Sequence, residues 1–379
     1  MRQATILLFL SLGGVVAAGG LLSGCKPAPA PSPPDPIAQA VGAIRNAPQT
    51  PAAMPAPSQP RPPPSPTVIK AEVLLARAHA SPGVIDGLAG SNLERAVAAF
   101  EAINGLPPDG QLSPAVWNRL AAFARSPVAG VYVETPADVA GPFYPDVGED
   151  LVAASKLASP GYSSPVEALA ARFHMSEALL TALNPGKDFT TAGERIVVAL
   201  PDISALAPVA SLQVDKAKAS VVALDDQGRM IASFPATVGS TERPSPSGVR
   251  KVVGVSFNPT YTYDPSKLTW GPKGHGRFII EPGPNNPVGQ VWIALNARGY
   301  GVHGSPRPDK IGKTASHGCV RLTNWDALLL AHAVKPGVVV TFVHQRGDAV
   351  QARAELTPWS RPAGAPGPGE SAPEPSRRG

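Results

Sequence analysis

Proline-rich segments divide this chain and limit where compact domains can form. The sequence has 46 prolines among 379 residues, and residues 26–67 are especially rich in proline and alanine. A segment of that composition has little to bury, so we expect a disordered, extended linker that reaches on the order of 100 Å. Whether this linker does more than connect its neighbours stays open. A second proline- and glycine-punctuated stretch predicts a linker at 126–160, and residues 358–379 predict a disordered tail.

The first folded unit is predicted at 68–125, as a small domain of three helices. Apolar residues recur there at helical spacing in two stretches, and Ser113 is the expected N-cap of a third helix. Two Asp-Gly pairs predict turns between the helices. This order resembles the type-1 peptidoglycan-binding domain, although Glu72 and Glu101 stand where that family tends to have glutamine. The resemblance implies that the domain binds the cell wall.

The second folded unit is predicted at 161–201 and contains two short helical patterns followed by a strand. We expect its first strand near residues 161–162 and its last at residues 196–200. With Asn184 and Gly193 at matching positions, the unit resembles a LysM module, in which two helices pack on a two-stranded sheet. The resemblance implies a βααβ fold that binds glycan.

The apolar pattern changes to a period of two from residue 211 onward, which predicts a mostly-β domain at 209–345. The candidate strands are S-L-Q-V-D, the two segments that flank the D-D-Q-G turn, and residues 252–257, 290–295 and 338–343. A helix over 324–333 is expected to pack across the sheet. A long insertion between strands is expected to form a lid over a groove. Its aromatic and histidine residues are Tyr261, Tyr263, Trp270 and His275.

A candidate catalytic site lies between the run G-V-H-G-S and the run S-H-G-C-V-R-L-T-N of this β domain. Cys319 follows His317 and Gly318 directly, and His303 lies upstream in its own H-G-S turn. A cysteine nucleophile needs a base for its proton and donors for an oxyanion. We predict His303 as the base and the backbone N–H groups around His317, Gly318 and Cys319 as the donors. Gly304 and Gly318 allow the backbone to approach a substrate closely.

Two other interpretations of Cys319 compete with that of a nucleophile. A lone buried cysteine commonly serves as a small core hydrophobe, but here glycine and histidine flank it and an arginine follows. A zinc site could use Cys319 with His317 and His303, but no second cysteine or H-x-x-x-H pair supports a fourth ligand. We therefore favour the nucleophile, and we expect no metal and no cofactor.

The run S-H-G-C-V-R-L-T-N, with the upstream Y-G-V-H-G-S, resembles the catalytic motif of the L,D-transpeptidases, the YkuD-type domain. The segment G-P-N-N-P-V-G at residues 283–289 resembles the loop on the substrate side of that family's site. The resemblance implies a mostly-β catalytic domain that acts on peptidoglycan stem peptides. It also implies that Cys319 attacks the carbonyl between an L- and a D-centre, that His303 is the base, and that the Gly304 carbonyl orients it.

Four further residues of the motif are candidates for binding the substrate, namely Ser305, Ser316, Arg321 and Asn324. Arg321 suits a carboxylate of the stem peptide, while bracing of the catalytic loop is an equally open role for it. Ser305, where the family often has threonine, and Asn324 are expected to hold either the loop or the substrate backbone.

The N-terminal residues 1–25 resemble a lipoprotein signal peptide. The sequence Leu-Ser-Gly-Cys, ending at Cys25, follows an apolar run and resembles a bacterial lipobox, so Cys25 is the expected acylated first residue of the mature protein. A single transmembrane anchor is the alternative, for which the apolar run is slightly short. With Cys25 lipidated, Cys319 is a lone thiol in an oxidising compartment, which favours a reactive role. We expect a periplasmic lipoprotein held by a lipid anchor, in the outer membrane rather than the inner.

The three resemblances together imply a multidomain α+β enzyme of the cell wall. The net charge of +5 suits a polyanionic envelope, and nothing resembles a nucleic-acid-binding module. The leading hypothesis is a peptidoglycan L,D-transpeptidase that transfers a tetrapeptide acyl group from Cys319 to an amine acceptor. The alternatives are hydrolysis at the same site, as in an L,D-carboxypeptidase, and a non-enzymatic lipoprotein that ties a membrane to the wall. The acceptor and the oligomeric state stay open.

Overall fold

The computed structural model describes residues 35–50, 62–266, 268, 271–272 and 274–343. The predicted lipobox at Cys25, Trp270 of the insertion and the tail at 358–379 lie outside these residues. Within the described ranges, no helix combines the length and apolar character needed to cross a membrane. From Pro36 on, the described residues belong to one unit of the chain with two hydrophobic cores.

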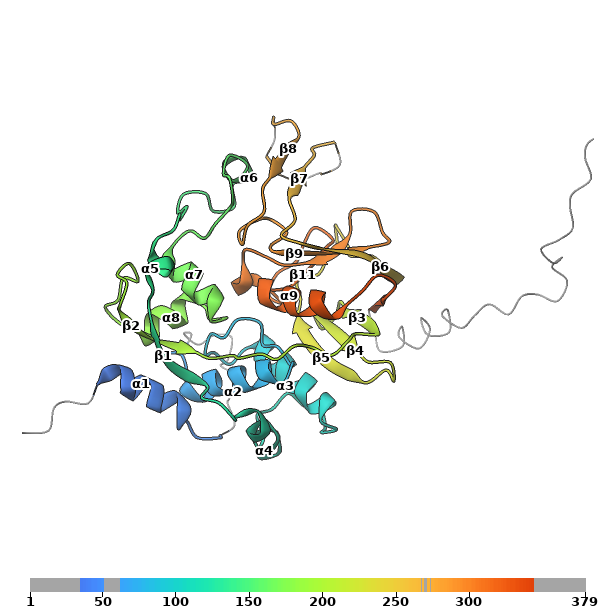
Figure 1. Cartoon of the computed structure of the whole chain (residues 1–379). Helices are drawn as coiled ribbons and strands as arrows, with labels where there is room; N and C mark the ends of the chain where they lie inside the picture. The colour runs from blue at the N-terminus through green and yellow to red at the C-terminus, as the bar shows by residue number, and fades with distance from the viewer. Residues whose placement is uncertain (1–34, 51–61, 267, 269–270, 273, 344–379) are drawn as a thin grey trace, which may run out of the picture. The chain divides into compact units, whose positions relative to one another are not determined.

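The first core is built mainly by a helical domain, residues 36–123 (Figure 1). Its elements are α1 (Pro36–Arg45), α2 (Pro66–Arg77), α3 (Ser91–Ile103), α4 (Pro114–Leu120) and the 3-10 helix η1 (Ala121–Phe123). The predicted N-cap of α4 is confirmed, because the side chain of Ser113 accepts a hydrogen bond from the Val116 amide. Pro66 and Pro114 stand in the first turn of their helices, where a missing N–H costs nothing.

Helix α1 lies inside the segment 26–67 for which we predicted disorder, and there the prediction is wrong. Ile37, Val41 and Ile44 follow one another at spacings of four and three, so they form one apolar stripe on a helix. Ile44 is only 1% exposed and belongs to the core of the helical domain. The high proline content of the surrounding sequence hid this short amphipathic pattern.

The two Asp-Gly turns are each held by a buried glutamate. The amide of Gly87 donates to Glu72 Oε2 at 2.9 Å, and the amide of Gly110 donates to Glu101 Oε2 at 2.8 Å. Burial is the main cause that raises the pKa of both carboxyl groups. Both glutamates therefore have a structural role within the helical domain.

A second module, residues 129–199, contains a two-stranded antiparallel sheet and short helices. Its elements are β1 (Ala129–Val133), α5 (Pro136–Val139), α6 (Leu151–Ala154), α7 (Pro165–Arg172), α8 (Glu177–Leu183) and β2 (Arg195–Ala199). The first strand is thus in the predicted linker 126–160 and not near residues 161–162, which corrects both expectations. Val131 and Val133 of β1 are exposed, so the apolar side chains of this strand do not mark its buried face.

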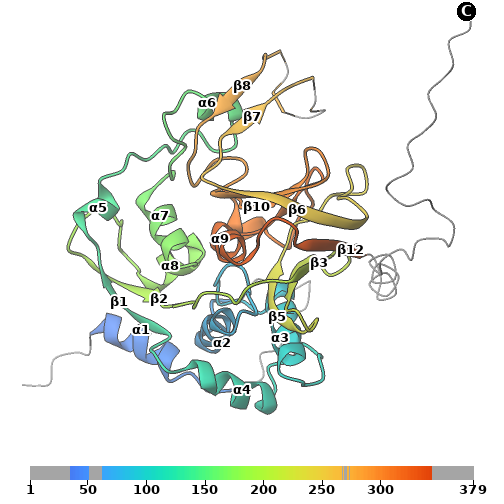
Figure 2. The same cartoon turned by 45° about the vertical axis from the view of Figure 1, so that its right-hand side comes forward.

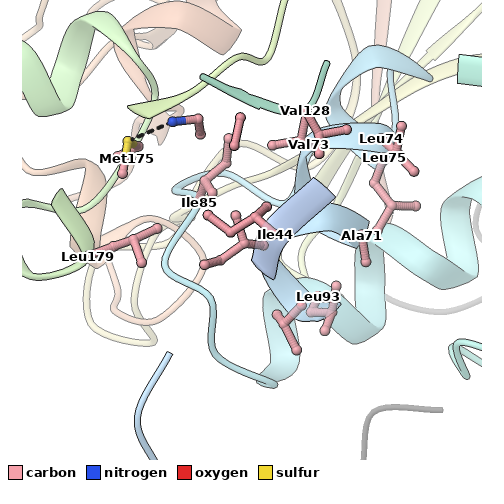
Figure 3. Packing of buried hydrophobic residues seen from close by; sticks show 14 of the residues in the cluster. Ile44, Ala71, Val73, Leu74, Leu75, Ile85, Leu93, Val128, Met175 and Leu179 are labelled. Atoms are coloured by element: carbon pink, nitrogen blue, oxygen red, sulfur yellow. Dashed lines mark hydrogen bonds between the residues drawn. The ribbon is translucent and has the colours of Figure 1, made fainter. Parts of the chain in front are cut away.

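The helical domain and the second module share the first core. Figure 3 shows Ile44 and Leu74 of the helical domain in the same cluster as Met175 and Leu179 of the second module. The Arg77 side chain, 7% exposed, also joins the two parts through hydrogen bonds to backbone carbonyls. These carbonyls belong to Phe123, Ser126, Pro127, Leu200 and Pro201. The two predicted binding units are therefore one folded body.

The second core belongs to the predicted β domain, which is built on an eight-stranded sheet. The strands are β3 (Ser211–Asp215), β4 (Ser220–Leu224), β5 (Met230–Pro235), β6 (Gly248–Phe257), β9 (Val291–Leu295), β10 (Gly301–His303), β11 (Val320–Arg321) and β12 (Val339–Val343). Their order is β11-β10-β9-β6-β12-β3-β4-β5. Thr237, just after β5, exchanges two backbone hydrogen bonds with Arg321 of β11, so the sheet curls until its edges meet.

Two additions to the sheet frame the site. Strands β7 (Tyr261–Tyr263) and β8 (Phe278–Ile280) form a hairpin within the predicted lid insertion. Helix α9 (Asn324–Ala333), capped by the Thr323 side chain, packs into the second core as expected, and η2 (Pro308–Lys310) lies between β10 and β11. In both views α6 of the second module lies beside the β7–β8 hairpin (Figures 1 and 2).

Candidate active site

Strands β10 and β11 place the predicted nucleophile and base on one face of the sheet. They pair in parallel, with Val302 opposite Val320 and His303 opposite Arg321. Because side chains alternate along a strand, Val302 and Val320 point into the core, where each is at most 1% exposed. His303 and Arg321 lie on the other face. Cys319, two residues before Arg321, lies on that face as well.

The ring of His303 is fixed by stacking and by one hydrogen bond. Trp292 of β9 stacks on it, with ring centroids 5.3 Å apart. Nδ1 of His303 lies 2.7 Å from the Gly304 carbonyl oxygen, so Nδ1 carries the proton and Nε2 holds the lone pair of the neutral ring. Burial, followed by the positive charge of Arg321, lowers the pKa of His303 to about 3, against the raising effect of the Gly304 and Val288 carbonyls. A neutral His303 is able to accept a proton.

Cys319 is a free, half-buried thiol. Its Sγ lies 3.6 Å from the Gly299 carbonyl oxygen. Burial raises the pKa of the thiol, while a backbone hydrogen bond from Gly301 and the positive charge of Arg321 lower it. At rest the thiol and the imidazole are therefore both neutral, so the thiol proton must leave Cys319 during attack.

Ser316 holds the loop before Cys319, and its predicted role in binding substrate stays a prediction. Ser316 is 3% exposed, and its hydroxyl donates to the Cys319 carbonyl at 2.5 Å and accepts from the Gly318 amide at 3.1 Å. The Gly318 amide is therefore engaged within the loop, so it is not an open oxyanion donor. Gly318 has φ of 118°, and a Cβ there would come within 2.9 Å of the Tyr300 ring, so only glycine fits.

Asn324 and Ser305 also hold the loops of the site. Asn324 Oδ1 accepts from the Gln290 amide at 3.1 Å and its Nδ2 donates to the Pro284 carbonyl at 3.0 Å, which ties α9 to the loop 283–289. A Cβ at Gly304 would overlap with Asn324 Oδ1. Ser305 is 4% exposed and its hydroxyl accepts from the Arg307 amide. Of the two roles left open for these residues, the structure shows loop bracing.

Arg321 and Tyr261 present buried polar atoms with no hydrogen-bond partner among the described residues, namely Arg321 Nε and the Tyr261 hydroxyl. Burial raises the pKa of Tyr261 to about 12, and the charge of Cys319 acts in the same direction, so Tyr261 lies near the thiol. Burial lowers the pKa of Arg321. An unpaired buried polar group is costly unless a ligand satisfies it.

His317 is an exposed residue of the same loop. Burial, followed by the charges of Arg321 and Arg243, lowers the pKa of His317. Its exposed position contrasts with that of His303, which is 3% exposed and fixed on both sides. The contrast supports His303 as the base, and the oxyanion role of the His317 amide stays a prediction.

Sequence reasoning missed two residues of the site. Trp292 stacks on His303, but an aromatic residue in an alternating strand carries no mark of that role. Glu149 comes from the segment predicted as a linker, and its Oε1 lies 2.7 Å from Arg307 Nη1 and 3.0 Å from Lys310 Nζ. Both basic residues lie between His303 and Cys319 in the chain. Only the tertiary fold brings Glu149 to this edge of the β domain.

Comparison with known proteins identifies the class of this domain. Residues 210–342 match the family model of the "L,D-transpeptidase catalytic domain", and residues 64–120 match that of the "Putative peptidoglycan binding domain". The "Putative L,D-transpeptidase YkuD" of Bacillus licheniformis is 28% identical over 46% of this chain and 92% of that protein. The protein of the same name from Bacillus subtilis is also 28% identical, with the same coverage.

One solved structure shows how far the likeness extends in space. L,D-transpeptidase 3 from Mycobacterium tuberculosis is 20% identical and covers 36% of this chain and 62% of that one, with a TM-score of 0.30. The assignment therefore rests on the sequence family. The chain carries an L,D-transpeptidase catalytic domain preceded by a peptidoglycan-binding domain, and the predicted enzyme class is confirmed.

Proposed function

We propose that the chain forms a thioester between Cys319 and a peptidoglycan stem tetrapeptide and transfers this acyl group to an amine. The observation that carries the proposal is the shared face of Cys319, Arg321 and His303, with the His303 proton fixed on Nδ1. That arrangement leaves Nε2 as the acceptor for the thiol proton.

The reaction then has two balanced halves. Cys319 Sγ attacks the carbonyl carbon as its proton passes to His303, and the carbonyl oxygen becomes an oxyanion near the His317 and Cys319 amides. The tetrahedral intermediate collapses, the leaving amine takes the proton from His303, and a thioester remains. An acceptor amine attacks the thioester and passes its proton to His303. The thiolate leaves and recovers that proton.

Arg321 and Tyr261 are suited to hold the substrate. Their unpartnered polar atoms lie on the side of the sheet that bears the thiol. A carboxylate or carbonyl of the stem peptide satisfies the Arg321 guanidinium, and the positive charge also stabilises a developing thiolate.

The second module is proposed to be a LysM-like glycan-binding unit with an inserted segment. Its order β1, α7, α8, β2 follows a βααβ pattern once residues 134–164 are set apart as an insertion. Asn184 supports the pattern, since its side chain bridges the Leu180 carbonyl and both backbone groups of Val197. We further propose that the protein is a periplasmic lipoprotein attached through Cys25 to the outer membrane.

Mass spectrometry of muropeptides tests the reaction. The chain is incubated with purified peptidoglycan, and new cross-linked muropeptides are expected with the wild type but not with Cys319→Ala. Shortened stem peptides without cross-links would instead identify an L,D-carboxypeptidase. Wall binding with no covalent product in either protein would contradict the enzymatic proposal and favour a wall-anchoring lipoprotein.

A further inference from the structure

The second module contains a cavity that lies apart from the catalytic thiol. Its volume is about 530 Å³, and the inserted segment 134–164 and helix α7 line it. The lining residues that matter here are Asp138, Phe143, Tyr144, Ser159, Tyr162 and Arg172. Cavities of this size with several aromatic walls and a few polar groups are typical of small-ligand sites.

The half-buried aromatic rings of Phe143, Tyr144 and Tyr162 form much of the wall. Two of these rings pack closely against the backbone of a glycine. A Cβ at Gly141 would come within 3.0 Å of the Phe143 ring, and a Cβ at Gly161 within 3.3 Å of the Tyr144 ring. The Tyr144 amide also donates to the Tyr162 carbonyl at 3.0 Å, which joins the two ends of the inserted segment. The rings are thus held in place before any ligand arrives.

A fixed cation lies at the rim of the cavity. Arg172 Nη1 donates to the Tyr132 hydroxyl at 2.9 Å and to Asp138 Oδ1 at 2.7 Å. The guanidinium also lies over the Tyr132 ring, 5.2 Å from its centroid. The side chain is 55% exposed, and among the described residues its Nε and Nη2 atoms have no bonding partner. Arg172 therefore has oriented N–H groups left for a ligand.

The cavity wall is tied to the catalytic domain. Ser159 donates to the Pro282 carbonyl at 2.7 Å, and the next carbonyl, that of Pro160, accepts from the Asn285 amide at 3.0 Å. The neighbouring Pro284 carbonyl accepts from Asn324, the residue packed against Gly304 of the site. A ligand in the cavity therefore lies beside the loop 283–289 that borders the catalytic centre.

We propose that this cavity binds the saccharide chain of peptidoglycan and so presents the attached stem peptide to Cys319. Sugar rings have apolar C–H faces and a rim of hydroxyl and acetamido groups, which suit flat aromatic walls and a fixed arginine. The peptidoglycan-binding domain in the same chain supports this ligand class. The proposal rests on the proposed function in two respects, the glycan-binding role of the second module and the identity of the peptide that follows the glycan.

The test uses the full chain and an N-acetylglucosamine tetramer as the probe, with calorimetry as the measurement. Phe143→Leu and Tyr144→Leu keep apolar bulk but remove the flat faces, so each is expected to weaken binding about tenfold. Phe257→Leu is the matched control, because Phe257 is an aromatic residue 47% exposed on β6 of the catalytic domain, and its binding is expected to stay unchanged. Thermal unfolding shows that each variant is folded, and Arg172→Gln gives an independent variant if one aromatic variant fails to fold.

Tetramer affinity that is equal in all variants, or no binding by the wild type, would overturn the proposal. The proposal would also be overturned if the cavity variants bound the N-acetylglucosamine tetramer normally but lost binding of a sugar-free stem tetrapeptide. That result would make the cavity a peptide subsite. Acylation of Cys319 by a β-lactam is measured in parallel and is expected to be equal in all these variants. A wild type that binds the tetramer but is never acylated would contradict the proposed function and leave the cavity assignment standing.

Discussion

Nδ1 of His303 lies 2.7 Å from the carbonyl oxygen of the next residue, Gly304. A carbonyl accepts and cannot donate, so this contact selects one tautomer of the neutral ring and directs Nε2 away from Gly304. With the pKa of His303 lowered to about 3 and that of Cys319 raised, the ground state is not a thiolate–imidazolium pair. In the proposed reaction, a neutral His303 therefore takes the thiol proton during attack.

The first prediction concerns this pair and uses the rate of acylation by a β-lactam, followed by intact mass across pH. Cys319→Ala is expected to show no acylation at any pH. His303→Gln is expected to lose on the order of 10²–10⁴ in rate near neutrality. The rate of this variant is expected to recover at alkaline pH, where the thiol ionises without a base. The recovery needs a higher pH than the ionisation of an exposed cysteine, because burial raises the pKa of Cys319.

His317→Ala is the control for the base assignment. His317 is exposed and lies in the loop of the predicted oxyanion donors, so its loss is expected to slow acylation without recovery at high pH. If His317→Ala shows the alkaline recovery and His303→Gln does not, the two histidines have the opposite roles.

The second prediction concerns Arg321, whose positive charge lowers the pKa of both Cys319 and His303. Burial has the larger effect on each group, and for Cys319 the hydrogen bond from Gly301 also has a larger effect than Arg321. Arg321→Gln removes that charge, so the thiol pKa is expected to rise and the alkaline limb of the acylation profile to move to higher pH. Alkylation by a small neutral reagent measures the same shift without a substrate carboxylate. An unchanged profile with only weaker substrate binding would show that Arg321 acts on the substrate alone.

Much of the β domain could be predicted from alternation in the sequence. Strand β3 alternates apolar and polar residues because one face is buried, and helix α9 was placed by its start at Asn324. The motif also singled out Cys319 and His303, and the structure places them directly before β11 and at the end of β10. The short strands β10 and β11 were missed, because three and two residues contain too little pattern.

The contacts between parts of the chain could not be predicted in this way. Glu149 reaches Arg307 across 158 positions, and no local pattern marks such a pair. Ser316 was predicted to bind substrate, and Asn324 to hold either the loop or the substrate backbone, because motif residues near a nucleophile are polar for either reason. Only their hydrogen-bond partners distinguish a residue that braces the loop from one that contacts the substrate.

The third prediction concerns the shared core of the helical domain and the second module. Two independently folded binding units would act together through effective concentration, but here Met175 and Leu179 pack in one cluster with Ile44 and Leu74. Each exposed core side chain costs about 1.5–3 kcal/mol, so fragments 36–123 and 126–201 are expected to lack cooperative unfolding alone. Fragment 36–201 is expected to unfold in one transition by circular dichroism. A sharp transition in either half would show that the units are independent.

The fourth prediction concerns Cys25. Acylation of Cys25, as proposed, would anchor the mature chain, so the wild type is expected in the membrane fraction and Cys25→Ser in the soluble fraction. Cell fractionation at high salt measures this, because salt removes proteins that are held by charge alone. Retention of Cys25→Ser in membranes would identify a transmembrane anchor instead of a lipid.

The last prediction concerns Asp326 of α9, whose Oδ2 accepts from the Ser81 hydroxyl of the helical domain at 3.0 Å. Burial raises the pKa of Asp326 to about 7, although the Thr323 and Ser81 hydroxyls lower it. An unfolded aspartate has a pKa of about 3.9, so the folded state binds the extra proton between about pH 4 and 7. The contribution of this group to stability is complete below that window and falls as pH rises through it, by on the order of 4 kcal/mol.

Asp326→Asn keeps the shape and cannot ionise, so its melting temperature is expected to fall less than that of the wild type between pH 5 and 8. Glu134, whose pKa burial and Glu194 raise to about 7, titrates in the same window, so the difference between the two proteins is the informative quantity. Ser81→Ala removes a hydrogen bond that favours the ionised form of Asp326. The melting temperature of this variant is therefore expected to fall more between pH 5 and 8 than that of the wild type. Melting temperatures that change equally with pH in the wild type and Asp326→Asn would contradict the prediction. Asp326 would then already be ionised in the folded state, stabilised by the Ser81 hydroxyl.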